Sequence, residues 1–231
     1  MVRMWYSGFM HRKNPLVTGE IYHVFNRSIA DYVIFNDENE YSRMWELLKY
    51  YQINNELRFS EFIELKIIAQ IGFNNFFNTI SKGKDKLIQI IAYCLMPTHI
   101  HLVLKQLSDN GISNYLQKVL NSYSTYFNLT HKRKGPLWES RFKSVLVEND
   151  EQLNHLVRYL HLNSTTANLV NQPEDWLYSS YREYLGRVEE NQKMCQFDSI
   201  LDINPVLYRK YVNNQISYQG ELAKIKDLII D

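Results

Sequence analysis

The amino-acid sequence predicts an α+β fold built on an antiparallel sheet, and three observations lead to this class. Apolar runs rich in β-branched and aromatic residues predict strands. Two of these runs adjoin each other around Pro97, which predicts a hairpin and therefore antiparallel neighbours. Apolar residues at helical spacing lie between and after the strands. With 231 residues, the chain is long enough to bury a core of its own.

Four segments predict strands. Residues 20–29 (EIYHVFNRSI) are rich in β-branched and aromatic residues, and residues 87–95 (LIQIIAYCL) form a continuous apolar run bounded by turn signals. Residues 99–104 (HIHLVL) follow the turn at Pro97, where the missing N–H of proline does no harm. Residues 142–147 (FKSVLV) alternate as a strand does.

Three segments predict helices. Apolar residues recur at helical spacing in residues 37–51, again from Ile112 to Phe127, and again in residues 151–163. The order along the chain is therefore strand, helix, hairpin, helix, strand, helix. This order resembles a ferredoxin-like sandwich, an α+β fold with an antiparallel sheet and helices packed on one face.

The domain organisation is predicted to be simple. Residues 53–83 look like an insertion, with a helical stretch at 60–71 followed by an asparagine- and phenylalanine-rich segment and a polar one. We predict one domain over residues 1–187 that contains this insertion, and a C-terminal helical tail over residues 188–231.

The composition is that of a globular protein, with 45% apolar and 14% aromatic residues. Cys94 and Cys195 have neither CxxC spacing nor metal-type partners, so buried thiols in a reducing cytoplasm are expected. The first residues lack the apolar core and small-residue cleavage site of a secretion signal. No stretch approaches the roughly 20 consecutive apolar residues that a membrane-spanning helix needs, so no membrane partner is expected.

His99 and His101 stand on either side of Ile100 in a predicted strand. Because successive side chains of a strand alternate between faces, both imidazoles project to one side and Ile100 to the other. Two imidazoles one strand repeat apart can bind one divalent cation. A structural pair without a metal is the alternative, since no third ligand of the kind that zinc hydrolases use follows nearby in the sequence.

Tyr159 and Asn163 lie one turn apart on the predicted helix over residues 151–163. The apolar stripe of this helix faces the core, and both residues lie on one edge beside it. A phenol and an amide are therefore presented together to whatever packs next to the helix. The alternative is that Tyr159 is a half-buried boundary residue and that Asn163 simply ends the helix.

Basic residues gather between His131 and Lys143, where five cations face Glu139 alone. They are Lys132, Arg133, Lys134, Arg141 and Lys143. The net charge of the whole chain is only +1, so this local excess is what indicates a nucleic-acid partner, and a solvated basic loop is the alternative. Trp138, in the middle, is expected either to stack on a base or to pack beneath the loop.

Several segments resemble a known family. AYCLMPTHIHLVL, GPLWESRFKSVLVENDEQLNHLVRYLHLNS and EDWLYSSYREY, together with YHVFNRS near the start, are similar to the HUH-type single-tyrosine transposases and most of all to the REP-associated tyrosine transposases. The resemblance spans about residues 20 to 185 in the same order. It assigns His99 and His101 to the family's histidine pair, Tyr159 to its nucleophile and Asn163 to the polar third ligand. Thr98 and Ser164 depart from the usual Asn and Pro.

The resemblance implies an enzyme, a metal-dependent transposase that cleaves and rejoins single-stranded DNA through a 5′-phosphotyrosine at hairpin-forming sites. Mg²⁺ or Mn²⁺ would be bound by His99, His101 and Asn163. The implied partner is single-stranded or hairpin DNA. From their charge, Arg27 and the basic residues named above are candidates for contacts to its backbone, and Trp138 is a candidate for stacking on a base. The expected location is the cytoplasm, in association with the nucleoid, as a monomer or a homodimer.

Three other functions remain open from the sequence. One is a domesticated DNA-hairpin-binding protein that no longer cleaves. Another is a nicking enzyme of the replication-initiator or relaxase type, which uses the same chemistry with a different motif order. The last is an unrelated metal-binding α+β domain in which the histidine pair is structural.

Overall fold

The structure is a computed structural model that describes residues 15–55 and 57–216. Two predictions concern residues that the structure does not describe. They are the expected lack of a secretion signal at the start of the chain and the part of the predicted tail over residues 217–231. In the described part, a four-stranded sheet is accompanied by eight α-helices and two short 3₁₀ helices, η1 (Ile29–Asp31) and η2 (Pro173–Asp175). This confirms the predicted α+β class.

The sheet consists of β1 (Ile21–Arg27), β2 (Ile88–Met96), β3 (His99–Gln106) and β4 (Lys143–Leu146), in the order β2-β3-β1-β4. Every neighbouring pair is antiparallel, and β2 and β3 form the predicted hairpin. This strand order is the one expected of a ferredoxin-like sandwich. All four predicted strands are therefore confirmed, each with its ends shifted by no more than a few residues.

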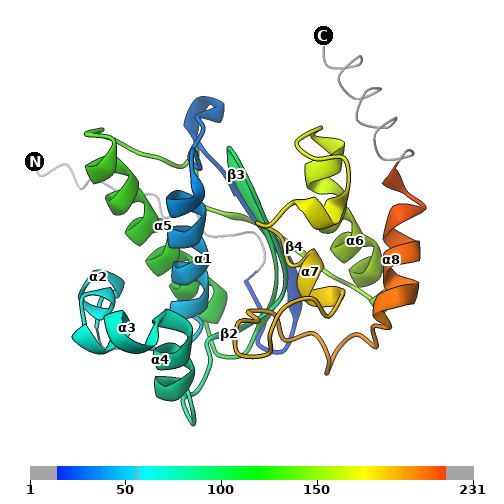
Figure 1. The fold of residues 1–231 in the computed structure, drawn as a ribbon, viewed down its shortest axis with the longest axis horizontal. Helices are drawn as coiled ribbons and strands as arrows, with labels where there is room; N and C mark the ends of the chain where they lie inside the picture. The colour runs from blue at the N-terminus through cyan, green and yellow to red at the C-terminus, as the bar shows by residue number, and fades with distance from the viewer. Residues whose placement is uncertain (1–14, 56, 217–231) are drawn as a thin grey trace, which may run out of the picture.

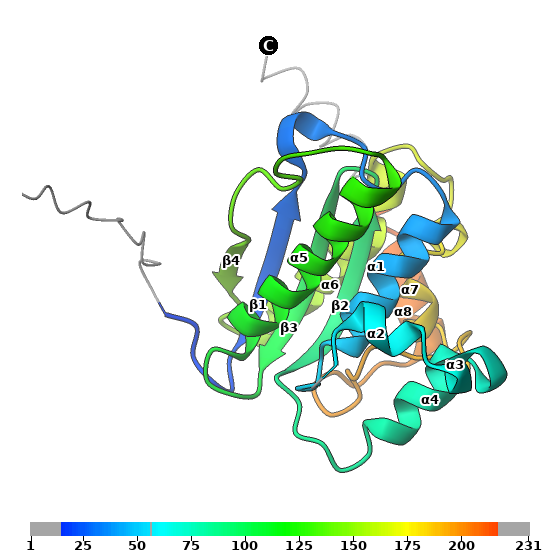
Figure 2. The same ribbon diagram turned by 90° about the vertical axis from the view of Figure 1, so that its left-hand side faces the viewer.

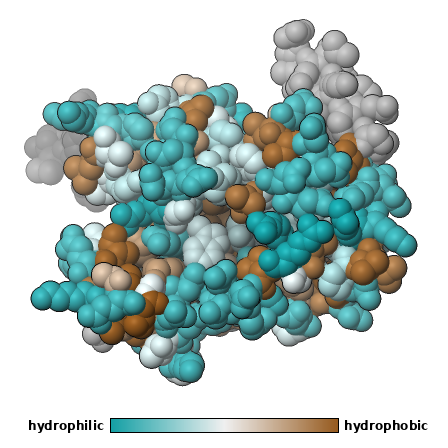
Figure 3. Space-filling model, viewed as in Figure 1, coloured by the Kyte–Doolittle hydropathy of each residue, from teal (hydrophilic) through white to brown (hydrophobic). Residues whose placement is uncertain are grey.

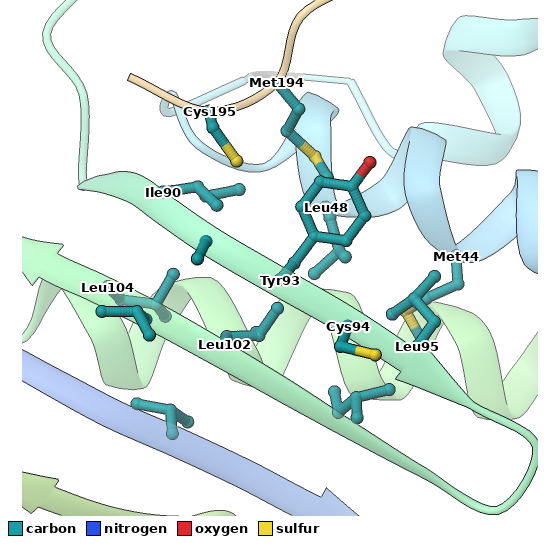
Figure 4. Close-up of a cluster of buried hydrophobic side chains, with 14 of the residues drawn as sticks. Met44, Leu48, Ile90, Tyr93, Cys94, Leu95, Leu102, Leu104, Met194 and Cys195 are labelled. Carbon is teal, nitrogen blue, oxygen red and sulfur yellow. The ribbon is translucent and has the colours of Figure 1, made fainter. Parts of the chain in front are cut away.

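One face of the sheet is covered by α1 (Glu38–Tyr50) and α5 (Gly111–Thr130), as Figures 1 and 2 show. The side chain of Asp37 caps α1 by accepting hydrogen bonds from two of its first backbone N–H groups. Alternate residues of β3, Ile100, Leu102 and Leu104, are buried beneath these helices. In Figure 4, Tyr93 of β2 lies among the buried side chains of this layer.

The opposite face is covered in part by α6 (Asp150–Thr166), which packs along β2 (Figure 1). The prediction that helices lie on one face of the sheet therefore omitted a layer. The physical reason lies in β2, whose apolar run has no polar face, so the strand must be covered on both sides. In β1 burial alternates, with residues of the second face only partly buried, and most residues of β4 are exposed.

The predicted insertion forms three short helices, α2 (Phe59–Ile63), α3 (Lys66–Ile71) and α4 (Phe73–Ile80). The single helical stretch expected over residues 60–71 is broken in two, and the asparagine- and phenylalanine-rich segment is itself helical. Gly72 separates α3 from α4 with a φ of 82°, a conformation that favours glycine. Phenylalanines of these helices cluster around Tyr50 of α1, so the insertion packs against α1.

The tyrosine-rich segment after α6 protects the edge of the sheet. The backbone N–H of Leu95 donates to Tyr178 at 2.9 Å, and the N–H of Ser180 donates to Tyr93 at 3.0 Å. The helix α7 (Tyr181–Tyr184) follows, and Tyr184 donates its hydroxyl to the carbonyl of Ile91 at 2.9 Å. This segment therefore satisfies backbone groups of β2 that an edge strand would otherwise expose.

The chain beyond residue 187 returns to α6 through α8 (Pro205–Asn213). His161 of α6 is fully buried, with Nδ1 2.7 Å from the Tyr208 hydroxyl and Nε2 2.8 Å from the Ser180 hydroxyl. Burial lowers the pKa of His161 to about 3, so the ring is neutral and donates one hydrogen bond while accepting the other. This histidine joins α6 to both the edge segment and α8.

We expect His161→Leu to lower the free energy of unfolding by about 2–4 kcal/mol, because two buried hydroxyls lose a partner. Chemical denaturation monitored by circular dichroism measures the change. His155→Leu is the matched control, since its side chain on the same helix is about half exposed. Equal stability of the two variants would mean that the buried contacts do not anchor α6.

The distribution of hydrophilic side chains on the surface and the burial of the two cysteines are those expected of a globular protein. In Figure 3 hydrophilic side chains cover much of the visible face, and hydrophobic ones form small separate groups. Among the described residues, no helix combines the length and the apolar character that crossing a bilayer requires. Cys94 and Cys195 are both buried and free, as predicted.

Candidate functional site

The candidate site begins with the two histidines of β3. In the sheet register His101 lies opposite Phe25 and His99 opposite Arg27, so both imidazoles lie on the sheet face away from α1 and α5. Ile100, between them, is 1% exposed and lies on the other face. The two rings have centroids 5.0 Å apart and are nearly perpendicular. The alternation of the strand thus brings the pair together as the sequence predicts.

We call this side of the sheet the histidine face; it carries His23, Phe25, His99, His101 and Lys143. Antiparallel register places Phe25 beside both His101 and Lys143. Because α6 lies along β2, the part of this face over β1 and β4 is less covered, and Lys143 is exposed. An extended ligand can therefore approach the histidines from this side.

Each imidazole is held through its Nδ1 atom. The Nδ1 of His99 lies 2.9 Å from the hydroxyl oxygen of Thr98, and the Nδ1 of His101 lies 3.0 Å from the Nε2 of His23. Within the described residues neither Nε2 atom forms a hydrogen bond. Histidines that bind metals are commonly oriented in this way, with one nitrogen fixed by a neighbour and the other free for the cation.

Burial keeps these rings neutral. It lowers the pKa of His99 to about 4, and the positive charge of Arg27 contributes in the same direction. The pKa of His101 is lowered well below its usual value by burial and then by its histidine neighbours, and burial lowers the pKa of His23 to about 4. At neutral pH all three are therefore in the uncharged form that can offer a lone pair.

Tyr159 reaches the histidines from α6. Leu153, Val157 and Leu160 of this helix are buried, and this apolar stripe fixes the rotation of the helix against β2. The Tyr159 ring then lies 6.0 Å from the His101 ring, edge to face, and the residue is 37% exposed. Burial raises the pKa of Tyr159.

Asn163 lies one turn further along the same edge and is 9% exposed. The helix continues to Thr166, so Asn163 does not end it, and that alternative is wrong. The Nδ2 atom of Asn163 is buried and has no hydrogen-bond partner among the described residues. An unpartnered donor of this kind is uncommon in a folded protein. A cation would bind the amide oxygen and not this nitrogen, so the unpaired Nδ2 does not bear on metal binding.

The donor set fits a divalent cation. In the described part of the chain, no three or more His, Cys, Asp or Glu side chains come together in a way that could hold a metal ion. The resemblance assigns the third ligand to the amide of Asn163, and this assignment stays a prediction. Two imidazoles and one amide oxygen leave positions open for substrate oxygens. Metal binding itself stays a prediction.

The basic side chains predicted to contact DNA lie in different surroundings. Arg27 borders the histidine face and pairs with Asp31 at 3.3 Å, with both side chains more than half exposed. Lys132, Lys134 and Arg141 are exposed on the loop that joins α5 to β4. Arg133 is instead bound within that loop, donating to the carbonyl of Pro136 at 2.7 Å and covering the ring of Tyr32.

Trp138 is partly buried beneath the basic loop. Its indole N–H donates to the carbonyl of Leu120 at 3.3 Å, and its ring lies 6.3 Å from that of Tyr123. These contacts favour the packing role among the two that the sequence left open. Contact of Trp138 with a base stays a prediction.

His23 is the site residue that the sequence analysis missed. It lies in the first strand within YHVFNRS, and the alternation of that strand places His23, Phe25 and Arg27 on one face. That signal was present in the sequence. The pairing of β1 with β3, which brings His23 next to His101, is visible only in the folded sheet.

Comparisons with known proteins show which families this chain is similar to. The model of the family described as IS200-like transposases matches residues 69–163, which include His99, His101, Tyr159 and Asn163. A protein of Haemophilus influenzae that is named as a REP-associated tyrosine transposase is 29% identical over 105 residues. That similarity covers 40% of this chain and 58% of the relative, so somewhat more than half of the relative's length is matched.

A solved structure shares the fold. It is a REP-associated tyrosine transposase bound to a REP hairpin, and it superposes with a TM-score of 0.51 at 14% identity, covering 84% of this chain and 94% of its own. At this identity the likeness concerns the fold alone. Taken together, the family match across both the histidine pair and the tyrosine helix, the curated relative and the shared fold show that the chain is similar to the IS200-like and REP-associated tyrosine transposases, the resemblance that the motifs predicted.

Proposed function

We propose that this protein cleaves and rejoins single-stranded DNA through a covalent bond to Tyr159, at sites that form hairpins. The observation that carries the proposal is the convergence of two distant segments on one face of the sheet. The Tyr159 ring lies 6.0 Å from His101, and the Nε2 atoms of both strand histidines are unpaired among the described residues. A phenol oxygen and a cation-binding pair next to each other suit phosphoryl transfer.

In the proposed reaction, the Tyr159 oxygen attacks the phosphorus of the scissile phosphodiester in line with the leaving 3′ oxygen. A bond forms between the tyrosine oxygen and phosphorus while the bond from phosphorus to the 3′ oxygen breaks. The phenol proton passes to a base or water, and the 3′ oxygen gains a proton and leaves as a hydroxyl. A second 3′-hydroxyl reverses the step and joins a new strand, so no nucleotide cofactor is consumed.

We propose that His99, His101 and Asn163 bind Mg²⁺ or Mn²⁺ at this site. The bound ion would neutralise charge on the non-bridging phosphate oxygens. The chain's own contribution is to keep both imidazoles neutral by burial, to orient them through Thr98 and His23, and to present the phenol beside them. The raised pKa of Tyr159 means that its proton must be removed with assistance near neutral pH.

The proposed substrate is single-stranded because its phosphates and bases are accessible to the protein. A single strand exposes its backbone and its bases, whereas a duplex buries the bases. Arg27 and Lys143 flank the histidines on the same face and can contact phosphates on either side of the scissile one. That a relative of the same fold is bound to a REP hairpin supports a hairpin as the DNA form that this chain recognises.

A covalent-adduct assay tests the proposal. End-labelled single-stranded oligonucleotides with a hairpin and single-stranded flanks are incubated with the protein and Mn²⁺, and the products are separated on a denaturing gel. We expect a labelled protein–DNA adduct that a chelator prevents and that a fully paired duplex does not form. Binding of the hairpin without any adduct, across a panel of flanking sequences, would instead favour the non-cleaving binding protein.

The two flanking cations should contribute additively to DNA affinity. We expect Arg27→Ala and Lys143→Ala each to weaken hairpin binding, and each to reduce the slope of log affinity against log salt by about 0.7, the value for one contact to a single strand. Fluorescence anisotropy over a range of salt concentrations measures this slope. Lys118→Ala is a suitable control, because this partly exposed lysine of α5 contacts Asn54 away from the histidine face. An unchanged slope for both variants would place the DNA elsewhere.

A further inference from the structure

We propose that His23 is a positioning residue that selects the tautomer of neutral His101 whose Nε2 can bind a cation. The inference rests on the proposed function and deepens it, because it assigns to the first strand a part in the metal site. Its basis is a direct contact: the Nε2 of His23 lies 3.0 Å from the Nδ1 of His101. The two rings are also stacked, with centroids 5.2 Å apart.

The backbone fixes this contact. His23 on β1 and His101 on β3 are near neighbours across the same pair of strands, since Phe25 lies directly opposite His101 and His23 directly opposite Val103. The His23 ring also packs against Phe25, with centroids 5.1 Å apart. A side chain held by the sheet and by a neighbouring ring has little freedom, so its nitrogen stays in place when His101 changes partners.

The position of one proton decides what His101 can do. A neutral imidazole carries its proton on one nitrogen and a lone pair on the other. If Nδ1 of His101 carries the proton, it donates to the His23 Nε2 and leaves its own Nε2 free for a cation. If His23 Nε2 carries a proton and donates, His101 must be protonated on Nε2, where it cannot bind a metal. Cation binding therefore requires His23 to accept the hydrogen bond, with its own proton on Nδ1.

His99 is oriented by a different kind of neighbour. The Nδ1 of His99 contacts the hydroxyl of Thr98, a residue in the turn between β2 and β3. The Thr98 hydroxyl can rotate either to donate a hydrogen bond to His99 or to accept one from it, so it does not select one tautomer. Thr98 also directly precedes His99 in the sequence, so this contact does not depend on strand pairing. His23 is 78 residues away from His101 along the chain, so its contribution depends on correct pairing of β1 with β3. Neighbours of this kind commonly change metal affinity by about 10–100-fold when they are removed.

Two substitutions of matched chemistry test the inference. The amide of Gln is long enough to place an acceptor where the His23 Nε2 lies, whereas the amide of Asn is too short. We therefore expect His23→Asn to raise the dissociation constant for Mn²⁺ by about 10–100-fold and His23→Gln to change it less than about threefold. Titration of Mn²⁺ into the DNA-free protein, followed by electron paramagnetic resonance of the free ion, measures both. His155→Gln, on the exposed side of α6, is the unaffected control.

A spectroscopic measurement separates positioning from loss of structure. In the metal-free wild-type protein, nitrogen NMR of the ¹⁵N-labelled histidines should find His101 protonated on Nδ1, and His23→Asn should shift this proton toward Nε2. Affinities of His23→Asn and wild type within about threefold of each other overturn the inference, and so does a wild-type protein that binds no Mn²⁺. A protein that binds Mn²⁺ with the expected ranking of variants but forms no DNA adduct would refute the proposed function and leave this inference standing.

Discussion

Tyr159→Phe is expected to abolish the covalent adduct with hairpin DNA, lowering its rate of formation by about ten-thousandfold or more. The substitution removes one oxygen atom, and that oxygen is the proposed attacking group. The ring should stay where it is, because its contact with His101 and its partial burial depend on the ring and not on the hydroxyl. We expect the free energy of unfolding to change by less than about 0.5 kcal/mol and hairpin affinity to stay nearly constant. The adduct gel and fluorescence anisotropy give the two readouts.

Tyr178→Phe is the matched control for this prediction. Tyr178 is also partly exposed, but it stacks on Tyr41 of α1 and lies away from the histidine face. Its adduct rate should equal that of the wild type. If Tyr159→Phe still formed the adduct at a comparable rate, another nucleophile would have to be sought among the remaining residues of the chain.

His101→Ala is expected to lower the rate of adduct formation by about a thousandfold at low Mn²⁺, and part of the loss should be recovered at high Mn²⁺. The variant removes one of two imidazole ligands, and a metal ion that stabilises charge in a transition state contributes several kcal/mol, with about 1.36 kcal/mol for each factor of ten. It also leaves the His23 nitrogen without its partner. The measurement is the adduct rate as a function of Mn²⁺ concentration.

The controls for His101→Ala address folding and chemistry separately. His155→Ala, at an exposed position of α6, should keep both the rate and its metal dependence. Thermal unfolding followed by circular dichroism establishes whether the His101 variant folds. A folded variant whose rate and metal dependence match those of the wild type would remove the strand histidines from the mechanism, and with them the assigned metal site.

Much of the fold was predictable because the patterns were local. The hairpin of β2 and β3 followed from two apolar runs around Pro97, and α1, α5 and α6 followed from apolar residues at helical spacing. The insertion was predicted less well, because residues 53–83 form helices of five to eight residues whose start depends on Gly72 and on packing against Tyr50. Helices this short have little stability of their own, so their sequence pattern is weak.

The candidate site was predictable in its parts. Strand alternation alone indicated that His99 and His101 share a face, and helix periodicity indicated that Tyr159 and Asn163 share an edge. Neither pattern says which face of a sheet a helix covers. The sequence-based arrangement with helices on one face would have placed α6 beside α1 and α5, and a helix there could not present Tyr159 to His101.

By itself, the sequence determined which residues are candidates for the chemistry, since the residue types, their spacing and the family motifs were all readable along the chain. Only the tertiary structure decided that α6 lies over the histidine face and that His23 meets His101. The physical reason is that these relations depend on strand register and on burial of both faces of β2. Both arise from contacts between segments far apart in sequence, which local periodicity does not record.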